Sequence, residues 1–118
     1  MEPIYEMQAN VLRMLAHPRR LEMLHLLADG PMEVGRIAQR LGISQPNASQ
    51  HLALLRQSGL VEIERNGREI RYQLSDPEVM VACNVMRGFL QRRISHLSTV
   101  TAAEDEPLAP LAATGVKP

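Results

Sequence analysis

The hydrophobic pattern of this chain changes its period once, near Val61. Before that point, apolar residues recur every three or four positions, which is the spacing of amphipathic helices. Between Val61 and Leu74, apolar and polar residues alternate instead, and Asn66-Gly67 interrupts the alternation. Because both of these residues tolerate positive φ, the pattern predicts a tight β-hairpin. The chain is therefore expected to fold as several short helices followed by one hairpin.

Start and stop signals divide the helical part into four helices before the hairpin and one after it. The breaks fall at His17-Pro18, Asp29-Gly30-Pro31, Gly42 and Ser58-Gly59. The third helix is expected over about 33–41, and the fourth begins after Ser44 as its N-cap. Asp76 precedes a proline, which predicts the cap of a fifth helix that continues to about residue 97.

A length of 118 residues accommodates one domain, which we expect over 1–97. From residue 98 onward Ala, Pro, Thr, Glu and Gly prevail without periodicity, so 98–118 is predicted to be a disordered acidic tail. The chain contains no apolar run of about 18 residues and no signal-peptide pattern. A single cysteine allows no intrachain disulfide. These features predict a cytoplasmic protein without membrane contact.

This order of elements is that of the winged helix-turn-helix fold, mainly α with a small β-hairpin as the wing. The fourth helix, with an aliphatic seam inward, turns short uncharged side chains outward near its N-terminus, and such groups read base edges and phosphates. Arginines flank the wing turn, where a phosphate strand would lie. The candidate DNA-contact residues are Ser44, Gln45, Pro46, Asn47, Ser49, Gln50, His51, Arg65, Arg68 and Arg71.

Double-stranded DNA is the partner that this surface predicts, and transcriptional regulation is the function. The formal net charge is zero, but residues 36–71 carry six arginines against three glutamates, which fits a polyanion. The alternative is a winged helix used only for protein contacts, with the fourth helix merely solvated. The absence of charge between Arg40 and Arg56 favours DNA. An enzyme is not expected, since glycine-rich phosphate loops, nucleophile elbows and zinc-protease motifs are all missing.

Four segments, which together cover most of residues 10–75, resemble the ArsR (arsenic-repressor-like) family of small winged-helix regulators. They are Leu15–Leu24, Ile37–Val61, Asn66–Arg68 and Tyr72–Leu74. The resemblance implies a homodimeric repressor that occupies an operator and leaves it when an inducer is sensed. It also implies a dimer interface formed by the first and last helices. Independently, both helices carry apolar stripes wider than one small core requires.

The metal sites of that family are not matched by this sequence. Where the resemblance implies two thiolate ligands at the start of the third helix, this chain has a glutamate and a glycine. Where the resemblance implies a zinc site along the last helix, two of the positions hold a phenylalanine and an arginine, which cannot bind zinc. The positions are Glu33, Gly35, Asp76, Glu78, Phe89 and Arg92. We therefore expect no metal and no cofactor.

Cys83 is the candidate redox switch, on the apolar stripe of the last helix. A free cysteine at such a position is most often a small buried hydrophobe, and this is the interpretation we favour. A sensing role would require a bond between the two Cys83 thiols of a dimer or chemical capping. Otherwise the inducer is expected to be a small ligand or a partner that acts at the dimer interface.

Overall fold

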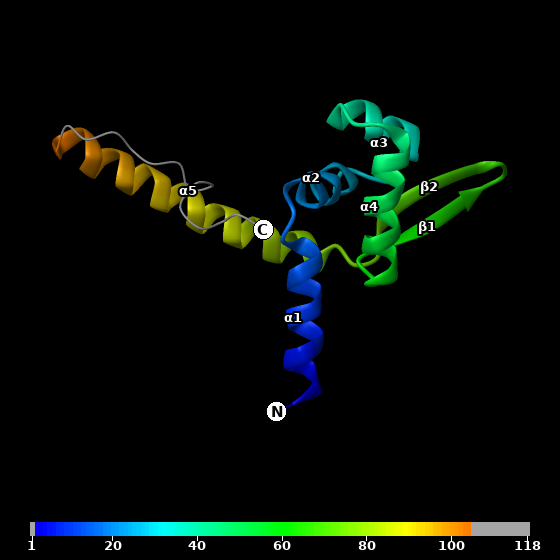
Figure 1. Cartoon of the computed structure of the whole chain (residues 1–118), viewed down its shortest axis with the longest axis horizontal. Coiled ribbons are helices and arrows are strands. Elements are labelled where there is room, and N and C mark those ends of the chain that lie inside the picture. Colours follow the sequence, from blue (N-terminus) through cyan, green and yellow to red (C-terminus); the bar gives the residue numbers. More distant parts are fainter. Residues whose placement is uncertain (1, 105–118) are drawn as a thin grey trace. The chain divides into compact units, whose positions relative to one another are not determined.

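The structure is a computed structural model of the whole chain, and residues 2–104 are described (Figure 1). The predicted order of four helices, a hairpin and a fifth helix is confirmed. The elements are α1 (Pro3–Leu15), α2 (Pro18–Leu27), α3 (Val34–Leu41), α4 (Gln45–Gln57), β1 (Val61–Asn66), β2 (Glu69–Leu74) and α5 (Glu78–Glu104). The chain divides into two compact units, the first ending at Met80 and the second starting at Val81.

Side-chain caps start three of the helices. The Oγ of Ser44 accepts a hydrogen bond from the backbone N–H of Asn47 at 3.2 Å, which confirms the predicted N-cap of α4. Asp76 Oδ1 accepts from the N–H of Glu78 at 2.9 Å, so the expected cap of α5 is also present. At α2, His17 Nδ1 accepts from the N–H of Arg19 at 3.2 Å. Short polar side chains at these positions satisfy N–H groups that have no partner within their helix.

The core of the first unit is aliphatic and lies between α2, α3, α4 and the start of β1. Its buried residues are Met23, Leu24, Leu27, Ile37, Ala38, Ala48, Leu52, Leu55, Leu60, Val61 and Met80. The inward aliphatic seam expected for α4 is confirmed, because its residues Ala48, Leu52 and Leu55 are fully buried. On α2, helical spacing predicts an inward face of Leu21, Leu24 and Ala28 with Met23 and Leu27 beside it, and this is partly wrong because Leu21 and Ala28 are exposed. Both possible stripes of this short helix share Leu24, and packing against α3 and α4 selects the stripe that contains Met23 and Leu27.

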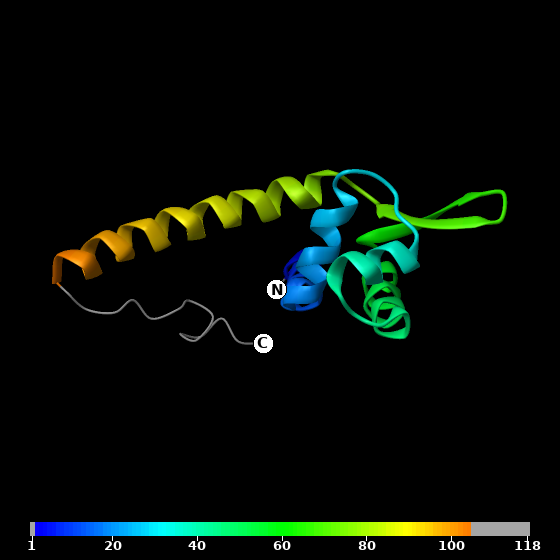
Figure 2. The ribbon, with the colours of Figure 1, turned by 90° about the horizontal axis from the view of Figure 1, so that it is seen from above.

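The hairpin extends beyond the helices of its unit, as Figures 1 and 2 both show. Its strands are antiparallel, with Val61 opposite Leu74 and Asn66 opposite Glu69. Gly67 in the turn has a φ of 66°, in the left-handed region that glycine adopts without strain. The base is anchored where Met32 and Tyr72 exchange two backbone hydrogen bonds of 2.9 and 2.8 Å.

Large apolar side chains remain exposed on the first and last helices. α1 has no buried residue. In the second unit, α5 is helical to Glu104 rather than to about residue 97, and residues 105–118 of the predicted disordered tail lie outside the described residues. The exposed large hydrophobic residues of these two helices are Ile4, Tyr5, Met7, Leu12, Val81, Val85, Met86, Phe89 and Ile94. None of the helices in the described part is long and apolar enough to cross a membrane.

Candidate nucleic-acid interface

The first turns of α4 present a group of uncharged polar side chains to solvent. Gln45, Pro46, Asn47 and Gln50 are exposed, and Ser49 is half-buried. Pro46 lies in the first turn, where its missing N–H is not needed by the helix. The exposed amides can both donate and accept hydrogen bonds, as base edges in a major groove require. We call the four polar side chains Gln45, Asn47, Ser49 and Gln50 the reading face.

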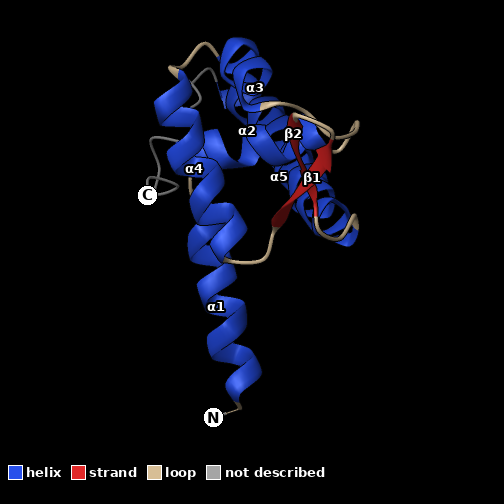
Figure 3. Ribbon diagram, turned by 90° about the vertical axis from the view of Figure 1, so that its right-hand side faces the viewer, coloured by secondary structure: helices blue, strands red, loops and turns tan. Residues whose placement is uncertain are grey.

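The helix-turn-helix holds the reading face at a fixed angle to α3, and Figure 3 shows the two helices joined by a short turn. Gly42 ends α3 with a φ of 68°, in the left-handed region. The N–H of Ile43 then donates to the carbonyl oxygen of Ala38 at 3.0 Å. Below the turn, Ala38 and Ala48 are both buried. Small side chains at these two positions allow α3 and α4 to pack closely.

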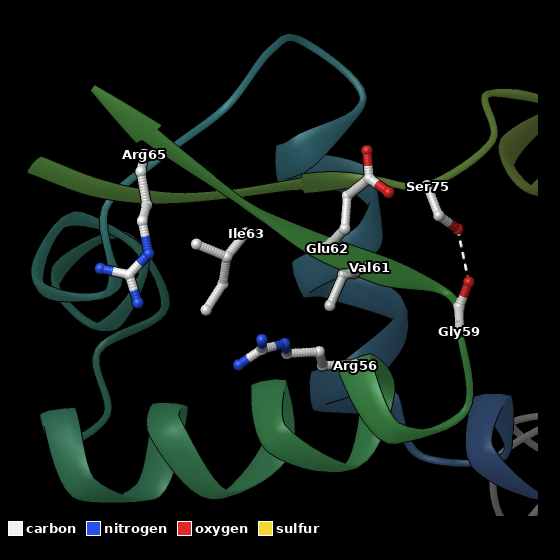
Figure 4. A pocket seen from close by; sticks show the side chains of 7 residues that line it. All are labelled: Arg56, Gly59, Val61, Glu62, Ile63, Arg65 and Ser75. Carbon is white, nitrogen blue, oxygen red and sulfur yellow. Dashed lines mark hydrogen bonds between the residues drawn. The ribbon is translucent and has the colours of Figure 1, made fainter.

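A cleft of about 590 Å³ lies between the C-terminal part of α4 and β1. Arg56 from α4 and Arg65 from β1 line this cleft. Figure 4 shows both guanidinium groups in the space between the helix and the strand. Val61 and Ile63 contribute apolar side chains. Arg68, beyond the turn, is exposed. Arg56 and Arg65 thus place two cations between α4 and the wing, the region that a phosphate backbone would follow.

Arg71 lies in a different environment from the other wing arginines. It is half-buried, and one of its terminal nitrogens is 3.1 Å from Glu64 Oε1 on the opposite strand. Its Nε is 3.9 Å from a carboxylate oxygen of Glu69. Two acidic side chains therefore already neutralise this guanidinium. Its predicted role as a phosphate contact remains a prediction, and its ion pairs make it a weaker candidate than Arg65 or Arg68.

His51 faces the first unit's own α2 rather than standing in the exposed reading face. The ring is half-buried, and its Nδ1 accepts a hydrogen bond from Arg20 Nε at 3.3 Å. The ring of His17 lies against it, with centroids 4.6 Å apart and planes tilted by 58°. Burial is the main cause that lowers the pKa of His51, and the nearby His17, Arg20 and Arg19 lower it further. These contacts support the structural interpretation of His51, and its predicted DNA contact stays a prediction.

Cys83 lies on α5 and is half-buried in the single chain. Burial raises the pKa of its thiol, so the nucleophilic thiolate is a smaller fraction at neutral pH than in a free cysteine. Within residues 2–104, no three His, Cys, Asp or Glu side chains gather in a group that could hold a metal ion. Asp76, which resembles one position of a zinc site, caps α5 as described above.

Two arginines near this surface are not among the residues that the sequence pattern predicts. Arg56 was not included among the DNA contacts, although its position at the charged end of an otherwise uncharged helix is a usable signal. Arg20 was not considered either. Its spacing of three from His17 places both on one face of α2, but their partner His51 is 31 residues further along the chain. Periodicity within one helix gives no information on such a distant contact.

Comparison with known proteins identifies a family of regulatory proteins and relatives that are transcriptional regulators. The family described as "Bacterial regulatory protein, arsR family" matches residues 17–62, which contain α2, α3, α4 and the start of β1. The biofilm growth-associated repressor of Xylella fastidiosa is 41% identical over 78 residues, which are 66% of this chain and 68% of that protein.

Two solved structures share both the fold and part of the sequence. One is a crystal structure of a Mycobacterium tuberculosis protein, with a TM-score of 0.73 and 33% identity over 81% of this chain and 97% of that chain. The other is a solution structure from Mycobacterium bovis, described as a homodimeric winged helix-turn-helix DNA-binding domain of a possible ArsR-family regulator. Its TM-score is 0.73 and its identity 31%, over 79% of this chain and 86% of that one.

Proposed function

The chain belongs to the ArsR family of bacterial regulatory proteins, and from this membership we propose that it binds an operator as a homodimeric repressor. It is a winged-helix DNA-binding transcriptional regulator. Its family and relatives are transcriptional regulators, which favours DNA binding over the alternative of a protein-interaction module. Which residues contact DNA, how two copies assemble and what releases them are the proposals developed below.

The uncharged and mostly exposed reading face of α4 is the observation that carries the proposal. A solvated helix face without function usually mixes lysine and glutamate, whereas these positions hold two glutamines, an asparagine and a serine. Side chains of this type discriminate bases through paired donors and acceptors, each good contact contributing about 1–3 kcal/mol. We place Ser44 and Pro46 beside them, at the helix start, where the positive end of the helix dipole attracts phosphates.

Arg65 and Arg68 neutralise phosphates in this proposal, and Arg56 joins them from the end of α4. All three are exposed. The cleft lined by Arg56 and Arg65 is open, so a sugar–phosphate strand reaches their guanidinium groups without rearrangement of the core. Such contacts raise the affinity for any sequence and set the salt dependence of binding.

Two copies associate through α1 and α5 in this proposal. The support is the unburied apolar surface of these helices: side chains such as Met7, Met86 and Phe89 are each more than half exposed in one chain. Large apolar side chains that gather exposed on a helix are typical of an interface. A twofold dimer would bind a near-palindrome with half-sites about one helical turn apart. A monomer in sedimentation at micromolar concentration with undiminished operator affinity would contradict this assembly.

A direct test measures binding to the DNA upstream of the protein's own gene by fluorescence anisotropy. A fourfold variant replaces Gln45, Asn47, Ser49 and Gln50 by alanine. We expect this variant to keep its affinity for a scrambled duplex and to lose its preference for the natural one. Circular dichroism checks that the variant is folded. A folded fourfold variant that binds the natural duplex normally would refute the assignment of the reading face.

Release from the operator is proposed to involve no tight transition-metal site. The experiment compares the wild type with Cys83→Ser after addition of zinc, peroxide or persulfide. Release by zinc that persists in the serine variant would contradict the proposal. Oxidant-induced release in the wild type alone would identify Cys83 as a switch. Equal responses of both proteins to the oxidants would assign Cys83 to packing, the role that its raised pKa favours.

A further inference from the structure

Arg20 connects three helices of the first unit through one guanidinium group. Its Nε donates to His51 Nδ1 on α4 at 3.3 Å. One of its terminal nitrogens donates to the carbonyl oxygen of Met14, in the last turn of α1, at 3.2 Å. Carbonyls at a helix end lack partners within the helix, so this bond satisfies a group that would otherwise be free. The side chain thereby holds the end of α1 and the inner side of α4 together.

The neighbouring residues reinforce this connection. The ring of His17, which caps α2, lies against the ring of His51. Arg19 donates to the carbonyl oxygen of Leu41 at the end of α3 at 3.3 Å and pairs with Glu22 at 3.2 Å. The N-terminal turn of α2 therefore contacts the ends of α1 and α3 as well as α4.

His51 directly follows Gln50 on α4 and is one helical turn after Asn47. A movement of α4 at His51 would therefore displace the reading face. Its Nδ1 accepts the bond from Arg20 only while that nitrogen carries no proton. A protonated ring would lose the bond and place a cation beside two arginines.

We propose that Arg20 is a positioning residue for DNA recognition, which holds α4 in its binding orientation through neutral His51, so that protonation of His51 weakens operator binding. The proposal rests on the DNA-binding function proposed above. It differs from a direct phosphate contact by His51, because a protonated ring that touched phosphate would strengthen binding instead.

The sign of the pH effect follows from the groups that face the ring. These are His17, Arg19 and Arg20 of the α2 segment, with Glu22 paired to Arg19. The pKa of His51 in the folded chain is lowered, with burial as the main cause. The stability that depends on the neutral ring is therefore fully present above the ordinary histidine value of about 6.5. It is lost as the pH falls from there through the lowered folded pKa.

The test measures anisotropy on the duplex upstream of the protein's own gene, at constant ionic strength, from about pH 8 to about pH 5.5. The informative variant is His51→Gln, whose amide oxygen accepts from Arg20 but does not titrate. His25→Gln, at an exposed position on α2, is the matched control. The expected result is that the Kd of the wild type rises relative to that of His51→Gln by about three- to tenfold on acidification, since one linked proton allows at most about tenfold per pH unit. The control should follow the wild type.

A wild-type Kd that falls relative to His51→Gln, or a His51→Gln profile that parallels the wild type, would overturn the proposal. A second measurement needs no variant: the midpoint of the His51 ring titration, followed by NMR, should move to lower pH when the duplex is added. Movement to higher pH would also overturn it. If the wild type binds no DNA at about pH 8, the proposed function itself fails. In that case thermal unfolding without DNA still tests the Arg20–His51 contact, because acid should destabilise the wild type more than His51→Gln.

Discussion

α4 and the β-hairpin both face the proposed DNA, but they are built on opposite principles. One side of α4 is an aliphatic seam of fully buried residues, and its exposed first turns carry no charge. The hairpin buries only Val61, and charged or polar pairs join its two strands, such as Glu62 with Gln73 at 3.0 Å. The helix is therefore part of the core, whereas the hairpin is a charged arm fixed at its base.

The difference matches the two tasks of a DNA-binding domain. Base recognition needs hydrogen-bonding groups at fixed positions, and a buried seam provides that precision. Phosphate attraction needs cations within reach of the backbone, and a long side chain on an exposed arm is sufficient. The predictions below test whether stability and specificity belong to α4 while salt-dependent affinity belongs to the hairpin.

The largest effect is expected for the buried seam of α4. Leu52→Ala should lower the free energy of unfolding by about 2–5 kcal/mol, because it leaves a cavity under the helix. The comparison is Ile70→Ala on the wing, where the side chain is 40% exposed, and a loss below about 1 kcal/mol is expected. Urea denaturation measures both. Similar losses for the two variants would show that the hairpin contributes to the core as much as α4 does.

Specificity is expected to depend on single amides of the reading face. Gln50→Ala should weaken binding to the operator by about 1–3 kcal/mol and leave binding to a scrambled duplex unchanged. Gln57→Ala is the matched control, since Gln57 is an exposed glutamine at the other end of α4. Competition anisotropy with both duplexes gives the ratio of affinities. An equal loss on the two duplexes would mean that Gln50 contacts the backbone and reads no base.

Arg68 should behave in the opposite way to Gln50. Arg68→Ala is expected to weaken binding to every duplex by a similar factor and to reduce the slope of log K against log salt by about 0.9. The measurement is a salt titration on the operator and on the scrambled duplex. A change of sequence preference without a change of slope would place Arg68 among the specificity contacts. It would contradict the assignment of specificity to α4 and of salt-dependent affinity to the hairpin.

Local signals were sufficient to predict the order of elements and the exposure of most polar side chains at the start of α4. Asn66-Gly67 and Ser44 act through their own turn or cap, and the structure contains both features where they were expected. The α4 seam follows in the same way from helical spacing. Caps, turns and helical spacing depend only on neighbouring residues, and they can therefore be predicted from the sequence alone.

Contacts between distant segments could not be predicted in this way. The stripe of α2 that is buried depends on where α3 and α4 pack, and helical spacing alone therefore places Leu21 inside although it is exposed. The bond between Arg20 and His51, and the ion pair of Arg71 with Glu64 across the hairpin, depend on which rotamers meet in the folded chain. These contacts decide which of the candidate residues are free to meet DNA.

The smallest effect is expected for Arg71, where the ion pair with Glu64 competes with DNA. Arg71→Ala should change the salt slope by less than half as much as Arg68→Ala, because the guanidinium is already neutralised by two carboxylates. The stability should fall by no more than about 1 kcal/mol, because solvent still reaches this half-buried pair and screens it. Glu64→Gln should release the guanidinium from its nearer partner and steepen the salt slope by up to about 0.9. If Arg71→Ala instead reduces the slope as strongly as Arg68→Ala does, then Arg71 leaves Glu64 for a phosphate when DNA binds, and the wing adjusts its ion pairs on binding while α4 stays rigid.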